Sequence, residues 1–414
     1  MVHMRFAVLA DLHIGRSIPL AIAEHRREAF ERALTKAVDA IVAAGVDYVF
    51  ICGDLFERRT LRPHMVEFTQ RELFRLVKET EAKHGRSIRI LVIRGNHDGR
   101  SQSDALDYIR HPLAGYLHVF GDEDITYDDD RIHVVGLNYY DQIDRAFEEK
   151  AKPALVKGEG IKVLMLHGFV ANYNDVPPGD SSLSLDQLAA SGADYVFTGH
   201  YHKKCEPRKL NGKGWVATPG STEVYDFAEE PEKGLYIVDT EGPKWTWAPI
   251  EPLHVMRQAK VGNDRGASPK WYEAEAVKTL RGFVDELHAQ HKQGYIRIKL
   301  EGTLSEGWPS DVSEDRIRET AQDPLLLWVD VDTLELNLPP SVARPMAENT
   351  DVAEYFRDFG GFAEEIREVH GRVREALEEE ASTKTGLLTA TQREQFIVDW
   401  VHRFEAKTFK EVKP

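Results

Sequence analysis

Strand-like apolar runs in the first 240 residues end repeatedly in Asp, Asn or His, usually beside a glycine. Helical patterns separate the early runs, over Glu24–Ala44 and from Pro63 to about Lys83. This alternation predicts a layered α/β domain with mixed sheets. Ligand sites in open α/β sheets lie outside the carboxyl ends of the strands, so we expect the side chains after these strands to converge. The five motifs are Asp11-Leu-His13-Ile-Gly15, Gly53-Asp54-Leu-Phe-Glu57, Gly95-Asn96-His97-Asp98, His167-Gly168 and Gly199-His200-Tyr-His202.

The composition narrows the class of protein. The chain has 414 residues, 42% of them hydrophobic and 29% charged, as in a globular protein with more than one domain. Apolar runs such as Val46–Cys52 are far shorter than the ~18 residues of a membrane span, and the short N-terminal run does not predict a signal peptide. Cys52 and Cys205 are the only cysteines, which argues against a disulfide framework and a thiolate metal cage. We therefore expect a cytoplasmic protein with no membrane segment.

The net charge of the chain does not by itself favour binding to nucleic acid. Lys and Arg total 53 against 69 Asp and Glu, which gives a formal net charge of −16. Overall electrostatics of this sign would repel nucleic acid, which favours basic surfaces. A site that holds divalent cations nevertheless presents positive charge locally, and clustered carboxylates and histidines build such sites.

The residue types in the five motifs suit a pair of divalent metals. Asp, Asn and neutral His offer oxygen and imidazole donors, as expected for manganese, iron or zinc in a hydrolytic site. Asp-x-His and His-x-His place alternate residues on the same side of an extended chain, so each pair can reach one metal. One carboxylate can bridge metals about 3.5–4 Å apart, the spacing used for displacement at phosphorus. A single histidine is usually structural, and Asn96 beside a glycine suggests a turn, but five motifs in order need one common explanation.

The five motifs together resemble the signature of calcineurin-like metallophosphoesterases. Within that superfamily the chain is similar to SbcD-type nucleases, the bacterial counterparts of the meiotic-recombination-eleven nucleases that process DNA double-strand breaks. Three segments carry the narrower resemblance: Ala10-Asp-Leu-His-Ile-Gly15, Gly53-Asp-Leu-Phe56 and Thr218-Pro-Gly-Ser-Thr-Glu-Val-Tyr-Asp-Phe227. The motifs cover roughly residues 5–240, and the later half of the chain matches in architecture only. The resemblance implies a layered α-β-β-α domain with mixed sheets, a small α/β capping domain and a C-terminal helical segment.

The same resemblance implies a role for each motif residue. Two divalent ions are implied, with Mn²⁺ favoured and Mg²⁺, Fe²⁺ and Zn²⁺ left open. One ion would be held by Asp11, His13 and His202, the other by Asn96, His167 and His200, and Asp54 would bridge them. His97 would act as an acid or phosphate-stabilising group near the leaving oxygen, which suits a side chain that titrates near neutrality.

Glu57 departs from the archaeal and eukaryotic relatives, which carry a histidine three residues after the bridging Asp. Because Glu57 follows Asp54 so closely, irregular backbone could aim both side chains into the site. We expect the Glu57 carboxylate to accept a hydrogen bond from His97 and favour the protonated imidazole, a catalytic role. The alternative is that Glu57 points to solvent and pairs with Arg58 or Arg59.

The chain divides into three predicted segments. Residues 1–250 form the nuclease domain, and prolines over Pro243–Pro252 mark its end. Residues 251–338 form the capping domain, with strands expected at Val255–Val261, Tyr295–Leu300 and Leu325–Val331 and helices over about Pro269–His291 and Val312–Ala321. Residues 339–414 combine a proline-bearing linker with amphipathic helices.

These features predict a metal-dependent DNA exonuclease and endonuclease, the catalytic subunit of an SbcCD-type double-strand-break repair complex. The resemblance implies DNA as substrate, a homodimer, and an SMC-like ATPase partner bound through the C-terminal helices. Those helices could instead pack against the chain's own domains. A small-nucleotide phosphodiesterase or phosphatase is the rival enzyme, although it needs neither cap nor helical tail. A non-catalytic scaffold subunit is the other alternative, and the complete set of ligand residues speaks against it.

Overall fold

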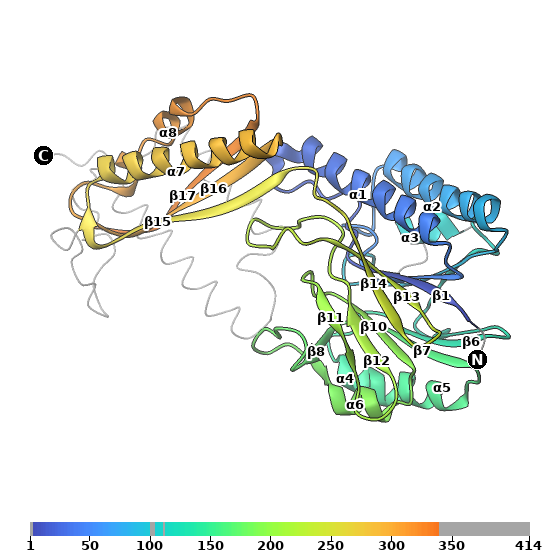
Figure 1. The fold of residues 1–414 in the computed structure, drawn as a ribbon. Helices are drawn as coiled ribbons and strands as arrows, with labels where there is room; N and C mark the ends of the chain where they lie inside the picture. The colour runs from blue at the N-terminus through green and yellow to red at the C-terminus, as the bar shows by residue number, and fades with distance from the viewer. Residues whose placement is uncertain (1–2, 100–103, 111, 339–414) are drawn as a thin grey trace, which may run out of the picture. The chain divides into compact units, whose positions relative to one another are not determined.

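Two six-stranded mixed sheets stack face to face in the N-terminal part of the chain (Figure 1). The computed structural model describes residues 3–99, 104–110 and 112–338, so the linker and partner-binding helices expected over 339–414 lie outside the described residues. The first sheet has the order β14-β13-β1-β2-β3-β4 and the second β11-β12-β10-β7-β6-β5. Strands β1 to β4 run parallel, as do β12, β10, β7 and β6, and antiparallel strands close three of the four edges.

The strands of these sheets have the following bounds: β1 Arg5–Leu9, β2 Tyr48–Cys52, β3 Arg89–Ile93, β4 Leu117–Val119, β5 Thr126–Asp128, β6 Ile132–Leu137, β7 Ile161–His167, β10 Tyr195–Gly199, β11 Cys205–Lys209, β12 Trp215–Thr218, β13 Gly234–Asp239 and β14 Lys244–Pro249. A separate parallel pair is formed by β8 Phe169–Ala171 and β9 Ser182–Ser184. The strand-like apolar runs expected in the first 240 residues lie at β1, β2, β3, β6, β7, β10, β12 and β13, and all eight are strands.

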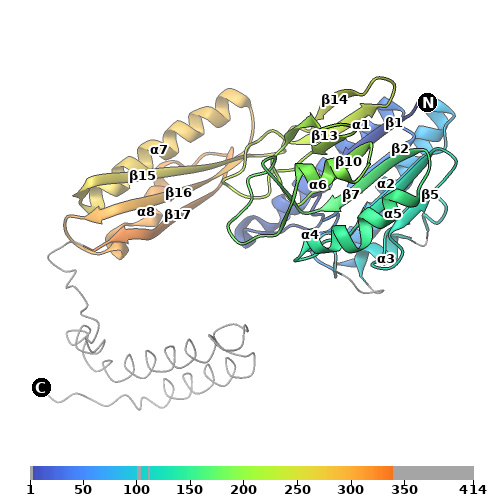
Figure 2. The same ribbon diagram turned by 90° about the horizontal axis from the view of Figure 1, so that it is seen from below.

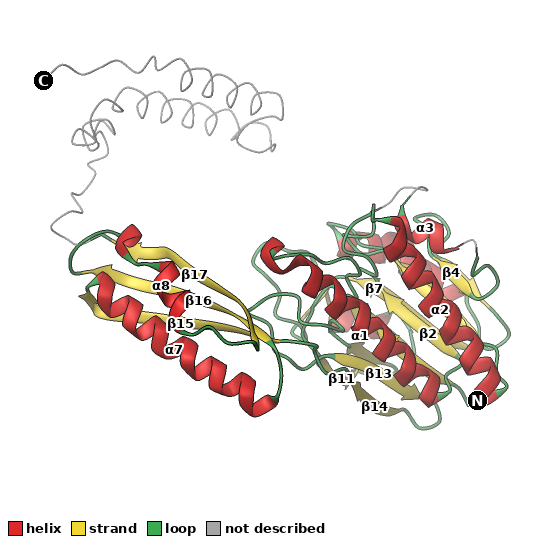
Figure 3. Ribbon diagram, turned by 90° about the horizontal axis from the view of Figure 1, so that it is seen from above, coloured by secondary structure: helices red, strands yellow, loops and turns green. Residues whose placement is uncertain are grey.

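Helices cover the outer face of each sheet. Figure 3 shows α1 (Ala23–Ala44) and α2 (Pro63–His84) side by side over the first sheet, with α3 (Ala105–Arg110) beyond them. Figure 2 shows α4 (Ile143–Ala146), α5 (Lys152–Lys157) and α6 (Leu185–Ala190) over the second, where a π-helix, Phe147–Ala151, joins α4 to α5. The layered α-β-β-α architecture with mixed sheets is therefore confirmed.

Alternation along the strands builds a separate core on each side of a sheet. In β1, Phe6 and Val8 enter the core between the two sheets, whereas Ala7 and Leu9 pack under the outer helices. Successive side chains of a strand point to opposite faces, so a strand buried on both sides reads as a continuous apolar run. The same burial fixes the register of the two sheets, and with it the position of every strand end.

The short strands were not predicted from the sequence. Strands β4, β5, β8 and β9 have three residues each, too few to show a period of two. Strand β14 occupies the stretch predicted only as a boundary, and it pairs with β13 at the edge of the first sheet. Its proline, Pro249, is the last residue of this edge strand, where proline is tolerated.

The described part of the capping segment is a βαβαβ unit. Strands β15 (Val255–Ala267), β16 (Gly294–Leu304) and β17 (Leu326–Asn337) form a parallel sheet. Helices α7 (Pro269–Gln290) and α8 (Glu314–Thr320) lie on one face of it and share its core (Figure 1). Two 3₁₀ turns, Leu20–Ile22 and Pro309–Asp311, complete the described elements. Because residues up to 338 form one compact unit, a domain boundary at 250 stays a prediction.

No helix in the described part of the chain is both long and apolar enough to span a bilayer.

Candidate metal centre

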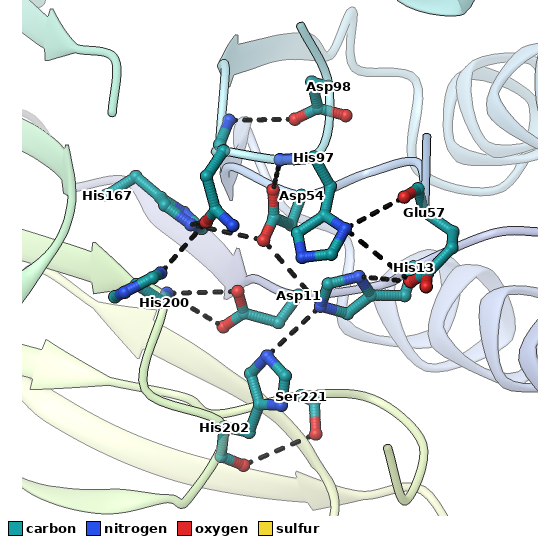
Figure 4. A network of polar contacts seen from close by, with 12 residues as sticks. Asp11, His13, Asp54, Glu57, His97, Asp98, His167, His200, His202 and Ser221 are labelled. Carbon is teal, nitrogen blue, oxygen red and sulfur yellow. Dashed lines mark hydrogen bonds and ion pairs between the residues drawn. The ribbon is translucent and has the colours of Figure 1, made fainter. Parts of the chain in front are cut away.

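The carboxyl ends of five strands meet at one place, where the two sheets face each other (Figure 4). Strands β1, β2 and β3 belong to the first sheet, and β7 and β10 to the second. Each parallel strand ends at the same edge of its sheet, so the residues that follow are gathered without any sequence proximity. The residues placed there are Asp11 and His13 after β1, Asp54 and Glu57 after β2, Asn96 and His97 after β3, His167 at the end of β7, and His200 and His202 after β10.

Four of the proposed ligands sit in strained backbone. Asp11, His13, Asp54 and His200 have φ values of 52°, 44°, 50° and 84°, in the left-handed region that residues other than glycine rarely adopt. Each such residue costs about 1–3 kcal/mol and persists only where its surroundings enforce it. Backbone strain of this kind clusters at active sites and ligand-binding positions.

The first group of candidate ligands is Asp11, His13 and His202, whose ligating atoms all lie within 4.8 Å of one another. The two Nε2 atoms of His13 and His202 face each other at 3.1 Å. Burial lowers the pKa of His13, which favours the neutral imidazole that binds metals. Two imidazole nitrogens and a carboxylate thus converge on one point, as a cation requires.

The second group surrounds the side-chain oxygen of Asn96. His167 Nε2 lies 3.2 Å from Asn96 Oδ1, and His200 Nδ1 lies 3.1 Å from the same oxygen. The Asp11 carboxylate accepts a hydrogen bond from the backbone N–H of His200, which ties this group to the first one. The two groups therefore form one continuous cluster of candidate ligands.

Asp54 lies between the two groups. Its Oδ1 accepts the backbone N–H of His97 at 2.8 Å, whereas Oδ2 lies 3.3 Å from His167 Nε2 and 3.8 Å from His13 Nε2. This oxygen is therefore placed to contact ions held by both groups. Gly95 makes room for the carboxylate, because a Cβ at position 95 would overlap Asp54 Oδ1.

The buried carboxylates of this cluster favour bound cations. Burial favours the neutral ring of His167, but Asp54 and Asp11 raise its pKa to about 9. Burial and the neighbouring His167 lower the pKa of His200 to about 3. The buried carboxylates thus draw a proton onto one histidine and leave the next one neutral. A divalent ion supplies the same compensation with both rings free to bind it, so the donor set fits metals.

His97 is partly exposed beside the two groups and contributes no ligand atom to either of them. Its Nδ1 lies 2.9 Å from the backbone carbonyl of Glu57, so Nδ1 carries a hydrogen and donates it there. Protonation and deprotonation of the ring therefore take place at Nε2. His97 is the predicted acid, and this geometry leaves one nitrogen for that role.

The predicted hydrogen bond between the Glu57 carboxylate and His97 is wrong, since Glu57 Oε2 lies 3.9 Å from His97 Nδ1. The solvent-facing alternative is wrong as well, because Glu57 is 5% exposed and its Oε1 accepts a 2.7 Å hydrogen bond from Arg16 Nη1. The cause is a bridge between Ile14 and Phe56, extended by the bond from Glu57 N–H to the Ile14 carbonyl, which turns Glu57 toward the β1 loop. The two side chains are within ion-pair distance but form no hydrogen bond, so a catalytic role of the Glu57 carboxylate through His97 stays a prediction.

Comparison with known proteins agrees with this arrangement. Residues 4–204 match the family model of the calcineurin-like phosphoesterases. The chain carries a calcineurin-like metallophosphoesterase domain. Phosphoester hydrolysis by a dinuclear metal centre is the chemistry of this family, and the described residues contain clusters of candidate metal ligands.

The metallophosphoesterase domain and the residues after it have relatives among curated proteins. The DNA double-strand break repair protein Mre11 of Archaeoglobus fulgidus is 27% identical over 331 residues, which cover 72% of this chain and 69% of that protein. YhaO, an uncharacterized metallophosphoesterase of Bacillus subtilis, is 25% identical over 321 residues and 73% of each chain. Among solved structures, a dimetal phosphatase from Danio rerio matches with a TM-score of 0.39 and 13% identity, covering 60% of this chain and 96% of that one.

Several residues that support the metallophosphoesterase centre were not predicted. Asp98 is buried beside His97 and accepts the backbone N–H groups of Phe56 and Gly95, each at 2.9 Å. Burial and the charge of Asp54 raise its pKa to about 6. Asp98 was part of a recognised motif, so its place in the sequence was known although its role was not. Tyr225 lies in the Thr218–Phe227 segment of the resemblance, but its contact with the centre was not predicted. Arg16, Glu229 and Lys233 support the centre through tertiary contacts that no local sequence pattern indicates.

Proposed function

We propose that this protein is a metal-dependent DNA exonuclease and endonuclease, the catalytic subunit of an SbcCD-type double-strand-break repair complex. The observation that carries the proposal is the extent of the likeness to Mre11 proteins. The Mre11 protein of Thermoplasma acidophilum is 23% identical over 383 residues, which cover 85% of this chain and 89% of that protein. The family model ends at residue 204, so the likeness continues into the capping segment, which hydrolysis of a small phosphoester does not need.

The residues of the centre suit this reaction. Asp11, His13 and His202 would hold one ion, Asn96, His167 and His200 the other, and Asp54 would bridge them, with Mn²⁺ the favoured metal. Bound ions would neutralise the phosphate and lower the pKa of a water nucleophile. His97, fixed through Nδ1, would deliver a proton from Nε2 to the departing sugar oxygen.

Basic side chains beside the centre favour a polyanionic substrate. Arg58, Arg59 and Arg62 follow Glu57 directly, are exposed, and form no ion pair with any described residue. In a chain with a net charge of −16, three exposed guanidinium groups within five residues of Glu57 are a local exception, although the charge of Glu24 acts on Arg62. Arginine binds phosphate oxygens in a bidentate manner, so this segment is suited to holding a nucleic-acid backbone.

The same proposal includes the partners of the protein and its cellular location. An SMC-like ATPase would bind residues 339–414, a homodimer would form, and the protein would act in the cytoplasm. A small-nucleotide phosphodiesterase stays the second candidate function, because the family's ligand set serves both substrates and YhaO has no assigned substrate in its name.

Hydrolysis assays with the full-length protein test the proposal. We expect linear double-stranded DNA and bis-p-nitrophenyl phosphate both to be cleaved with Mn²⁺ and neither with chelator. Asp54→Asn should slow both reactions by about 100-fold or more, because metal stabilisation of phosphate charge is worth several kcal/mol. Asp130→Asn is the matched control, because it changes an exposed carboxylate outside the five motifs. It should change neither rate.

The outcomes separate the candidate functions. Cleavage of the small diester without cleavage of DNA would favour the small-nucleotide enzyme. Absence of both activities in the metal-loaded protein would favour the scaffold. Full activity of Asp54→Asn would contradict the assignment of the bridging ligand.

A further inference from the structure

The two histidines of the first ligand group each contact a glutamate through the nitrogen that faces away from the pocket. His13 Nδ1 lies 3.1 Å from Glu57 Oε2, and both atoms are buried without a hydrogen bond to another described residue. His202 Nδ1 lies 2.7 Å from Glu229 Oε1. With both Nδ1 atoms turned to carboxylates, both Nε2 atoms point at each other across 3.1 Å. A histidine that binds metal with one nitrogen needs such a partner for the other.

Each glutamate is itself held in place by a cation. Glu57 Oε1 accepts a 2.7 Å hydrogen bond from Arg16, and Glu229 Oε2 accepts a 2.7 Å hydrogen bond from Lys233 Nζ. Glu229 Oε2 also accepts the backbone N–H of Tyr225 at 2.8 Å. These bonds occupy the second oxygen of each carboxylate, so neither side chain is free to swing away from its histidine.

Tyr225 completes this arrangement. Its ring centroid lies 4.5 Å from that of His13 and 4.6 Å from that of His202, and the Arg16 guanidinium lies 3.5 Å from the ring centroid (Figure 4 shows the two imidazoles that it contacts). The loop that carries Tyr225 is anchored by buried Arg26 of α1, whose guanidinium donates to the Val224 carbonyl at 2.5 Å. One loop between β12 and β13 therefore restrains both rings.

The second ligand group lacks this support. His167 Nδ1 donates to the backbone carbonyl of Cys52 at 2.8 Å, a neutral acceptor. His200 Nδ1 faces Asn96 Oδ1, inside the group itself. No carboxylate outside the pocket contacts either ring among the described residues. A carboxylate makes an imidazole a stronger donor than a carbonyl does, so the two groups differ in the electron density that they offer to an ion.

We propose that Glu57 and Glu229 are positioning residues for His13 and His202, and that they make the Asp11–His13–His202 position the tighter of the two cation sites. The inference rests on the proposed dinuclear centre. It adds the order in which the two cation sites of that centre bind their ions. It also gives Glu57 a role through His13 in place of the role through His97 that the sequence suggested.

Isothermal titration calorimetry of Mn²⁺ binding to the full-length, chelator-treated protein tests the inference without any substrate. The wild type is expected to bind two ions with different affinities. Glu57→Gln and Glu229→Gln should each weaken the tighter site by about 10–100-fold and leave the weaker site unchanged, since removing the outer partner of a ligand histidine costs that much affinity. Both variants should still bind two ions.

Glu230→Gln provides the matched control, because Glu230 is the exposed neighbour of Glu229 and should leave both affinities unchanged. The absorption spectrum of the Co²⁺-loaded protein gives a second readout, in which both glutamine variants should shift the bands of the first ion bound. The two glutamates lie on different loops, so either variant tests the inference alone if the other fails to fold.

Two results would overturn the inference. Unchanged affinity of the tighter site in both variants would mean that the glutamates do not act on the metal. Loss of one whole ion in Glu57→Gln would make Glu57 a direct ligand, consistent with its place beside His13 and His97 in a third cluster of donors. Because DNA is absent, a protein that binds ions as expected but does not cleave DNA would contradict only the proposed function.

Discussion

At the scale of single residues, Asp98 joins two loops that carry the centre. Its Oδ1 accepts the N–H of Phe56, in the loop after β2, and its Oδ2 accepts the N–H of Gly95, in the loop after β3. Asp98 is 1% exposed, so neither N–H group has water as a substitute. The carboxylate therefore sets the distance between the segment of Asp54 and the segment of His97.

Replacing Asp98 by Asn should destabilise the fold and slow hydrolysis. An amide offers one acceptor and one donor group, so one of the two backbone N–H groups would face an NH₂ and lose its bond. A buried unsatisfied donor costs about 1–3 kcal/mol, which urea denaturation of Asp98→Asn and wild type would measure. Asp130→Asn serves again as the exposed control. An unfolding midpoint equal to that of the wild type would show that Asp98 does not link the loops.

The residues of the centre differ in how far the sequence could predict them. Residue type and position after a strand were enough to select Asp54 or His200, because the sheet itself gathers strand ends. The direction of Glu57 depended on the bridge between Ile14 and Phe56, which joins segments about 40 residues apart, and the prediction failed there. Glu229 lies in an irregular loop with no motif, so only the folded chain reveals its contact with His202.

At the scale of elements, long periodic segments were predictable and short ones were not. Helix α1 was expected at Glu24–Ala44 and observed at Ala23–Ala44, because its apolar spacing and the following Gly45 mark both ends. The three-residue strand β4 carries no period of its own and exists because β3 offers an edge. Burial on both faces, visible as continuous apolar runs, made the central strands the most predictable part of the fold.

The approach of β10 to β2 yields a prediction at this scale. A Cβ on Gly199, the last residue of β10, would overlap the backbone carbonyl of Cys52 and lie 2.9 Å from His167 Nδ1. Gly199→Ala should therefore force the two sheets apart at the centre, with a loss of about 1–3 kcal/mol in the free energy of unfolding and a loss of Mn²⁺ binding.

Gly282 offers the matched control for this substitution. It lies exposed within α7, and a Cβ there would meet nothing within 4 Å. Gly282→Ala should stabilise the protein by up to about 1 kcal/mol, the difference in helix propensity. Thermal unfolding of the two variants should therefore shift in opposite directions. A shift of the same sign in both would contradict the close approach of the sheets.

At the scale of the whole described chain, α1 and the capping segment are joined through a buried histidine. His254 precedes β15, and its Nδ1 is hydrogen-bonded to the Tyr295 hydroxyl at 2.6 Å. The His25 ring of α1 is packed edge-on against it, with centroids 5.7 Å apart. Burial and the nearby His25, Arg26 and Arg32 lower the pKa of His254 to about 4, so the ring is neutral in the folded protein at neutral pH.

This histidine should make the stability of the protein fall in mild acid. Above pH 6.5, His254 is neutral in the folded and unfolded chains and contributes no pH dependence. Below pH 6.5, His254 binds a proton in the unfolded chain but not in the folded chain. The free energy of unfolding therefore declines until about pH 4, where His254 is protonated in both forms. Between pH 7.5 and 5.5, wild type should lose about 1 kcal/mol more than His254→Gln, measured by urea denaturation in chelator. His64→Gln, an exposed histidine on α2, should behave as wild type. Equal losses in wild type and His254→Gln would mean that this junction does not exclude the proton.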